Sequence, residues 1–188
     1  MTPRIALLIL SLSFLFSSQI PGRTQGTAAW LDESTPASWN KVGSSIPAAP
    51  KVDGATLPRC RDQARPAQLD EDKHVRDRGW DLVGPYQGGW QMLVIRATAG
   101  YDGMCRPRRF QDFVFVGGVF AGTLSPSPME SRTDGAIGRV FLQGANRLTA
   151  EYQRYTAKDP LCCPSGTTTI VFDIARDPPV VRPASSGR

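Results

Sequence analysis

The four cysteines are the residues of this chain whose chemistry and spacing are most informative: Cys60, Cys105 and the adjacent Cys162 and Cys163. Neighbouring residues of an extended chain point to opposite sides, so the two adjacent thiols should face different partners. We therefore predict two structural disulfides that join Cys60 and Cys105 to Cys162 and Cys163, and both such pairings stay open. The rival interpretation is a redox switch, in which a disulfide between the two neighbours forms and breaks. Zinc binding is disfavoured, because adjacent cysteines lack the two-residue spacer of zinc knuckles.

One histidine and several carboxylates are the candidates for acid–base chemistry. His74 would activate a nucleophile such as Ser165 only if the fold brought the two together, and neither lies in the strand–turn–helix context of a hydrolase elbow. We expect His74 to be an exposed surface residue. Two facing carboxylates would suit a glycosidase, and the sequence leaves open which acids face each other: Asp102, Asp112, Glu130, Asp134, Glu151 and Asp159.

Arginines near these acids are expected to brace loops rather than bind a ligand: Arg106, Arg132 and Arg154, paired with Asp134 or Asp159. No residue set reaches the specificity of a catalytic or metal motif. We therefore predict a non-enzymatic binding or structural module without cofactor or bound metal. The alternative is an extracytoplasmic hydrolase that uses a carboxylate pair or His74.

A polar segment at residues 124–135 is the candidate binding loop. It contains two prolines that limit backbone freedom and ends in the turn pair Asp134–Gly135. Stiff polar loops on a strand scaffold are where binding surfaces are commonly placed. Ser131, Arg132 and Asp134 are the candidate contact residues, and a plain connector between strands is the alternative.

The first 26 residues have the order of a secretory signal peptide: a basic start, an apolar run and small residues. The apolar run, residues 5–16, is shorter than the roughly 20 residues that a membrane helix needs. We predict cleavage of residues 1–26, location in the periplasm or outside the cell, and no integral membrane segment after cleavage. Export favours oxidation of the cysteines.

The charge of the chain argues against a nucleic-acid partner. The formal net charge of +5 falls to +3 when Arg4 and Arg23 leave with the signal peptide. The basic residues that remain are scattered and interleaved with acids, whereas nucleic-acid binding calls for a concentrated basic stripe. We expect instead an envelope or extracellular partner, whose identity the sequence does not give.

Three further segments follow the signal peptide. Residues 27–59 predict an irregular arm rich in Pro, Ala and Ser, in which Trp30 and Trp39 pin the chain to the domain. Residues 60–176 are predicted to form a single domain. Residues 177–188 are rich in Pro, Val and Ser, and we predict that they form a flexible tail. The best short helix lies within residues 67–78.

Short apolar runs around glycine-containing turns predict a mainly β or α+β fold: an antiparallel sheet of six or seven strands built from hairpins and stapled by disulfides. One hairpin joins residues 80–84 to 90–96, the second turns at Gly117–Gly118, and the third joins residues 139–143 to 148–156. Residues 167–174 alternate strictly, with one apolar face, as a half-buried strand requires. That face carries Thr168, Ile170, Phe172 and Ile174.

Several short motifs together resemble the LppP/LprE lipoprotein domain: Gly79–Trp80 and residues 102–107, 111–116, 120–126, 131–136 and 159–165, the last with the block Cys162-Cys163-Pro164-Ser165. The resemblance runs from about Cys60 to Ile174. It implies an exported domain of bacterial envelope proteins, including cyanobacterial ones, and supplies no catalytic residues. Lipoproteins carry an acylated cysteine just after the signal's apolar core, and this sequence has no cysteine before Cys60, so we expect a protein without that lipid anchor.

Overall fold

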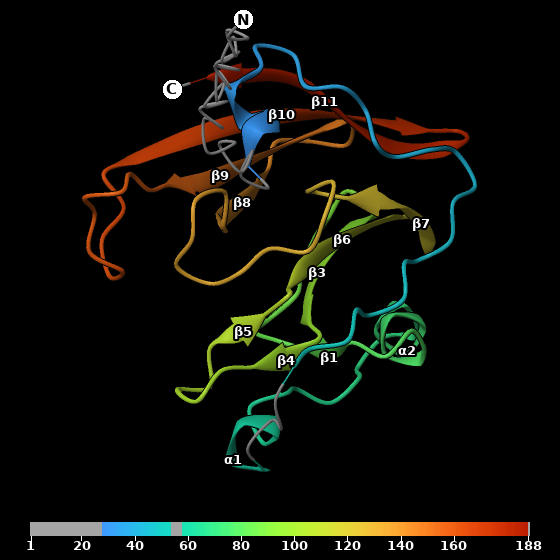
Figure 1. Ribbon diagram of the computed structural model, residues 1–188. Helices are drawn as coiled ribbons and strands as arrows, with labels where there is room; N and C mark the ends of the chain where they lie inside the picture. Colours follow the sequence, from blue (N-terminus) through green and yellow to red (C-terminus); the bar gives the residue numbers. More distant parts are fainter. Residues whose placement is uncertain (1–27, 54–57, 188) are drawn as a thin grey trace, which may run out of the picture.

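The computed structural model describes residues 28–53 and 58–187, and most of its strands belong to two antiparallel sheets (Figure 1). Within these described residues, three short helices precede the strands: η1 (Ala29–Asp32), α1 (Pro58–Arg61) and α2 (Asp70–Asp77). The signal peptide predicted for residues 1–26 lies outside the described residues. The helix expected within residues 67–78 is confirmed as α2.

The first sheet has the strand order β1-β3-β6-β7, with β2 also paired to β3. Its strands are β1 (Asp81–Leu82), β2 (Gln87–Gly89), β3 (Met92–Thr98), β6 (Gln111–Val116) and β7 (Val119–Thr123). The second sheet has the order β11-β10-β9-β8, formed by β8 (Ile137–Leu142), β9 (Arg147–Arg154), β10 (Gly166–Arg176) and β11 (Pro179–Gly187). A small ribbon pairs β4 (Gly100–Tyr101) with β5 (Pro107–Arg108).

The predicted antiparallel β fold is confirmed, whereas the single sheet of six or seven strands is wrong. The hairpin at Gly117–Gly118 forms between β6 and β7, and the hairpin over residues 139–156 forms between β8 and β9. In the first predicted hairpin β1 does pair with β3, but the expected loop between them contains β2, which pairs with β3 as well. A strand made of Gln87 and two glycines carries no apolar alternation that the sequence could reveal.

One hydrophobic core fills the space between the two sheets. The strand predicted at residues 167–174 is β10, and its apolar face is buried as expected, with Ile170 and Phe172 fully inaccessible. Val94 on β3 and Val114 on β6 belong to the same core cluster. The two sheets therefore pack face to face. The alternation of apolar and polar residues along β10 reflects this packing, because only one face of the strand meets the core.

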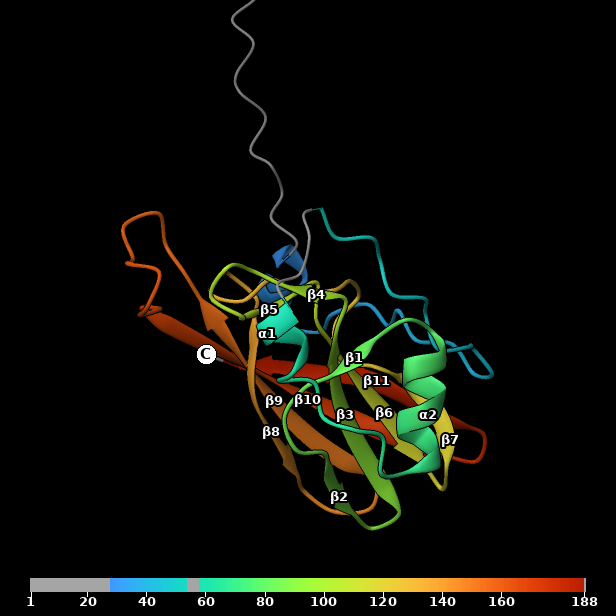
Figure 2. The same cartoon turned by 90° about the horizontal axis from the view of Figure 1, so that it is seen from below.

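A second core covers the other face of the first sheet. Phe113 and Phe115 of β6 pack there with Trp80 and with Val75 of α2, and α2 lies beside β6 and β7 in Figure 2. Every residue of β6 is buried. A strand covered on both faces is apolar throughout instead of alternating, which explains the continuous run from Phe113 to Val116.

The flexible tail predicted for residues 177–188 is wrong, since residues 179–187 form β11. This strand pairs with β10 along almost its whole length, with Asp173 opposite Arg182 and Ile174 opposite Val181. Val180 and Val181 are buried. Strand formation depends more on pairing and burial than on the intrinsic preference of the residues. The stabilisation gained by pairing with β10 therefore outweighs the low strand propensity of Pro, Ser and Gly in the tail.

The arm is irregular, as predicted, but it lies on the domain along most of its described length. Leu31 is 1% exposed. The Trp30 ring meets Tyr152 edge-on at 5.0 Å, and the Trp39 ring meets Phe172 at 6.1 Å. The Trp39 Nε1–H donates to the Thr123 carbonyl at 3.1 Å. The two indoles therefore anchor the arm to the core between the sheets.

Asn40 joins the arm to the neighbouring edges of both sheets. Its Nδ2 donates to the Thr123 carbonyl on β7 at 2.9 Å and to the Val181 carbonyl on β11 at 3.0 Å, while its Oδ1 accepts from the Thr123 N–H at 2.9 Å. The Asn40 side chain occupies space that is free only because residue 122 is a glycine without a Cβ. A Cβ on Gly122 would lie 2.3 Å from Asn40 Cγ, and the φ of Gly122 is +138°.

We expect Asn40→Ala to lower the free energy of unfolding by about 1–3 kcal/mol, because it leaves the Thr123 backbone groups without these partners. Chemical denaturation followed by tryptophan fluorescence measures the change. Asn146→Ala is the matched control, because Asn146 is an exposed turn residue. Equal stability of the Asn40 and Asn146 variants would contradict a stabilising role for the arm.

Candidate functional site

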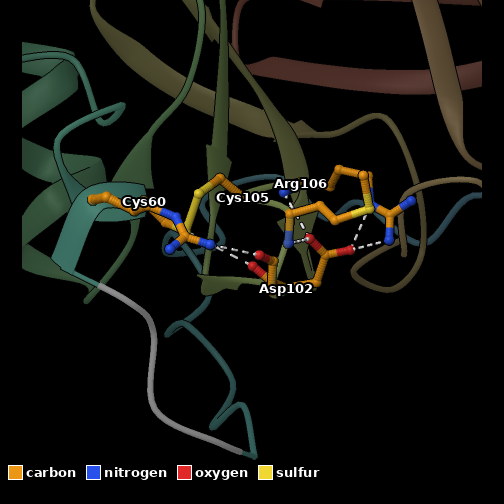
Figure 3. Close-up of a disulfide and its surroundings, with 7 residues drawn as sticks. Cys60, Asp102, Cys105 and Arg106 are labelled. Atoms are coloured by element: carbon orange, nitrogen blue, oxygen red, sulfur yellow. Dashed lines mark hydrogen bonds and ion pairs between the residues drawn. A yellow bond between two sulfur atoms is a disulfide. The ribbon is translucent and has the colours of Figure 1, made fainter.

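The first disulfide joins α1 to the loop that follows β4. Cys60 and Cys105 are bonded, with their Cα atoms 4.9 Å apart (Figure 3). Arg59 adds a hydrogen bond from Nη2 to the Gly103 carbonyl at 3.1 Å. The second bond joins Cys162 directly to Cys163. The prediction that Cys60 and Cys105 pair with Cys162 and Cys163 is therefore wrong.

The physical reason is the local conformation of Cys162 and Cys163. The rule that neighbours point to opposite sides holds for extended chain, but this segment turns, with the Cys163 N–H donating to the Pro160 carbonyl at 2.9 Å. The loop joining β9 to β10, which carries both residues, also lies apart from α1 in both views (Figures 1 and 2).

Asp102 fixes the loop that holds Cys105 (Figure 3). Its Oδ1 accepts from the N–H groups of Met104 at 2.8 Å and Arg106 at 2.9 Å, and its Oδ2 accepts from the Arg106 guanidinium at 2.5 Å. Burial alone would raise the pKa of Asp102, but these bonds outweigh it and hold the pKa below its usual value. The carboxylate thus presents both Cys105 and Arg106 in fixed positions.

We expect the double substitution Cys60→Ser with Cys105→Ser to destabilise the protein by about 2–4 kcal/mol, because the bond closes a loop with a sequence separation of 45 residues. Calorimetric melting of the purified variant measures the loss. The double substitution of Cys162 and Cys163 by serine is the matched control, since that bond spans neighbouring residues. A larger loss in the control than in the first variant would contradict this assignment.

Two of the three predicted binding-loop residues line one cavity, and the third does not. Ser131 and Arg132 line it, and the Ser131 hydroxyl donates to the Pro107 carbonyl at 2.6 Å. Arg132 is exposed and has a left-handed backbone, with φ at +59°. Asp134 instead accepts from Arg154 at 2.8 Å and from the Tyr155 N–H at 2.9 Å. Asp134 therefore braces the loop and is not part of the cavity wall.

The cavity has a volume of about 310 Å³ and lies where β3, β5, β8 and β9 approach the 131–132 turn. Its wall combines apolar surface with three guanidinium groups and two neutral polar side chains: Arg96, Arg106, Pro107, Phe110, Ser131, Arg132, Ala136, Ile137 and Gln153. Sequence reasoning missed Arg96, because only the pairing of β3 with β6 places it near the turn.

Arg96 is held in place by a nearly buried carboxylate. Its Nε and Nη2 donate to the two oxygens of Asp112 at 2.7 and 2.8 Å, and Nη2 also donates to the Gly138 carbonyl on β8 at 3.1 Å. Burial would lower the pKa of Arg96, but Asp112 more than compensates and raises it. The guanidinium also lies 5.6 Å from the centre of the Phe110 ring.

The cavity has an excess of positive charge. Asp112 and Asp102 balance Arg96 and Arg106, whereas Arg132 has no ion-pair partner among residues 28–53 and 58–187. Guanidinium groups bind carboxylates and phosphates through paired N–H donors. The arrangement is suited to an anionic group whose apolar remainder contacts Phe110, Pro107 and Ile137.

The acids considered for catalysis are each engaged elsewhere. Five form ion pairs with arginines: Asp102–Arg106, Asp112–Arg96, Glu130 with Arg108 and Arg109, Asp134–Arg154, and Glu151–Arg139. The expectation that arginines brace loops holds for Arg106 and Arg154, although Arg106 pairs with Asp102. Arg132 pairs with neither Asp134 nor Asp159. His74 lies exposed on α2.

The sixth acid, Asp159, closes the loop between β9 and β10. Oδ2 accepts from the N–H of Thr156 at 2.7 Å and of Ser165 at 3.1 Å, and from the Ser165 hydroxyl at 2.8 Å. Oδ1 accepts from the Thr156 hydroxyl at 2.9 Å. These bonds, the Thr156 backbone bond first, lower the pKa of Asp159 to about 2.

The lowered pKa of Asp159 predicts how the loop responds to acid. Because the folded pKa lies below the unfolded one, the ionised carboxylate stabilises the closed loop above about pH 4, and this contribution is lost as the pH falls towards 2. In the folded protein, the amide chemical shifts of Thr156 and Ser165 should titrate together with a midpoint near pH 2. Asp159→Asn should abolish the titration. Shifts that titrate around pH 4 would contradict the hydrogen-bonded arrangement.

The fold and the site define a two-sheet antiparallel β domain with two disulfides and a basic cavity. Residues 90–177 of this domain match the LppP/LprE lipoprotein family, which confirms the predicted resemblance over that segment. The match begins just before β3 and ends after β10, so the arm, α1 with Cys60, and β11 lie outside it. No curated protein and no solved structure matches the chain.

The family match indicates an envelope-associated protein, and the match and the disulfides are consistent with a location outside the cytoplasm. Within the described parts of the chain, no helix has the length and apolar character that crossing a bilayer requires.

Proposed function

We propose that this protein is an exported, non-enzymatic binding module of the bacterial envelope, periplasmic or secreted, that holds a small organic anion in the arginine-lined cavity. The observation that carries the proposal is the meeting of Arg96, Arg106 and Arg132 at one cavity in which Arg132 is not neutralised by any described acid. The family match supports the envelope setting.

The cavity favours an anion with an apolar body over a bare inorganic ion. Its volume of about 310 Å³ falls within the range of small-ligand sites. Arg96 and Arg106 already bond to carboxylates, so they contribute to the shape of the cavity and to its positive electrostatic potential. Arg132 offers N–H donors that are free to bind a ligand. Phe110 and Ile137 offer apolar contact that an inorganic ion would not use.

The positioning of the arginines supports a binding role over a catalytic one. Arg96 is fixed by two hydrogen bonds to Asp112, and Arg106 is fixed by Asp102. Among the acids and the histidine considered for hydrolysis, none lines this cavity. We therefore place the hydrolase alternative behind a binding role.

We expect Arg132→Ala to weaken the binding of benzoate and phenyl phosphate about five- to tenfold, which corresponds to about 1–1.4 kcal/mol for an exposed charge-assisted contact. Isothermal titration with the whole chain measures the dissociation constants. Benzamide, the neutral analogue of benzoate, should bind more weakly than either anion.

Arg182→Ala is the matched control, because it removes the same charge from an exposed position on β11 that does not line the cavity. The control should bind both anions like the unmodified protein. An equal loss in both variants would show non-specific attraction, and no saturable binding of either anion would overturn the proposal.

A further inference from the structure

The Cys162–Cys163 disulfide lies on the surface of the loop between β9 and β10. Both cysteines are exposed, as are Pro160 and Leu161 just before them, with Leu161 68% exposed. In the other disulfide, Cys60 is 0% exposed and Cys105 is half-buried. Attack on a disulfide requires access to one of its sulfurs. The two disulfides of this protein therefore differ sharply in their accessibility to an incoming thiol.

The surface disulfide also contributes little to folding stability. A disulfide stabilises mainly by restricting the unfolded chain, and the effect grows with the length of the loop that it closes. Cys60 and Cys105 are separated by 45 positions, whereas Cys162 and Cys163 are separated by one. A bond between neighbours removes very little freedom from the unfolded chain, so structural stapling does not account for it.

The loop does not need the disulfide to keep its course. Asp159 holds Thr156 and Ser165 together through four hydrogen bonds, three of them at 2.9 Å or less. Tyr155 adds a hydrogen bond from its hydroxyl to the Leu161 carbonyl at 3.3 Å. Breaking the sulfur–sulfur bond would leave these contacts in place, so the pair can be reduced while the domain stays folded.

We propose that Cys162 and Cys163 form a thiol–disulfide exchange site that accepts two electrons from a partner dithiol. One thiolate of the partner attacks a sulfur of the pair, a mixed disulfide forms, and the other cysteine leaves as a thiolate. The second thiol of the partner then attacks the mixed disulfide. The partner ends as a disulfide, and Cys162 and Cys163 end as two thiols once their two thiolates take up the two protons that the partner's thiols have released. Leu161 and Pro160 supply an exposed apolar surface for contact with that partner.

The test uses dithiothreitol as the dithiol, added in limiting amounts to the native whole chain, with alkylation and peptide mass mapping. We expect Cys162 and Cys163 to be alkylated at least about tenfold faster than Cys60 and Cys105, because both cysteines of the first pair are exposed, whereas Cys60 is buried and Cys105 is half-buried. The melting temperature of the protein reduced only at this pair should stay unchanged. Equal rates for the two pairs, or reduction of Cys162 and Cys163 only after unfolding, would overturn the proposal.

A second variant separates the exchange site from a folding defect. The chain with Cys162→Ser and Cys163→Ser should melt at the same temperature as the unmodified chain and lack the fast phase of dithiothreitol oxidation. Its binding of benzoate should be unchanged, since the arginine-lined cavity has no residue in this loop. A fast phase that persists in this variant, or a marked fall in its melting temperature, would also overturn the proposal.

Discussion

The contact between Asn40 and the edges of the two sheets holds the arm across the opening of the main core. Thr123 of β7 gives both its backbone groups to the Asn40 amide, and Val181 of β11 gives its carbonyl. On the opposite side of the sandwich, Arg96 of β3 reaches the Gly138 carbonyl of β8. The two sheets are therefore joined by polar contacts at both margins, with the apolar core between them. Arg96, which makes the second of these contacts, also lines the cavity, so the geometry of the site depends on how the two sheets are held together.

The first sheet also needs cover on its outer face, and that cover comes from segments outside the match to the LppP/LprE family. Ile46 of the arm and Val75 of α2 pack on the face that carries Phe113 and Phe115. Trp80 donates from its Nε1 to the Pro47 carbonyl at 2.8 Å. Without these residues, β6 would expose one side of a continuous apolar run. The matched segment is thus the centre of the fold, and its neighbours complete the core.

Local patterns in the sequence predicted the parts of the fold that local chemistry determines. The turn at Gly117–Gly118 and the alternation along residues 167–174 depend on residues within a few positions of one another, and both were predicted correctly. The strand β11 was missed because its stability comes from pairing with β10 and not from its own composition. The disulfide pairing was missed because the turn at Pro160–Cys163 depends on hydrogen bonds that the residue types alone do not show. Two of the residues that line the candidate site, Ser131 and Arg132, were predicted from the sequence, because a stiff polar loop is visible there. Arg96 joins the site only through the register of β3 with β6, which the sequence does not show.

The Asn40 amide has a further consequence for how this protein behaves among other chains. Strands β7 and β11 are the last strands of their sheets, and a last strand presents unpaired backbone groups that another protein can extend. Asn40 meets the N–H and carbonyl of Thr123 and the carbonyl of Val181 much as the peptide group of an added strand would. One side chain therefore blocks two neighbouring edges at once. The arm therefore shields the margin where the two sheets come together from strand addition by another chain.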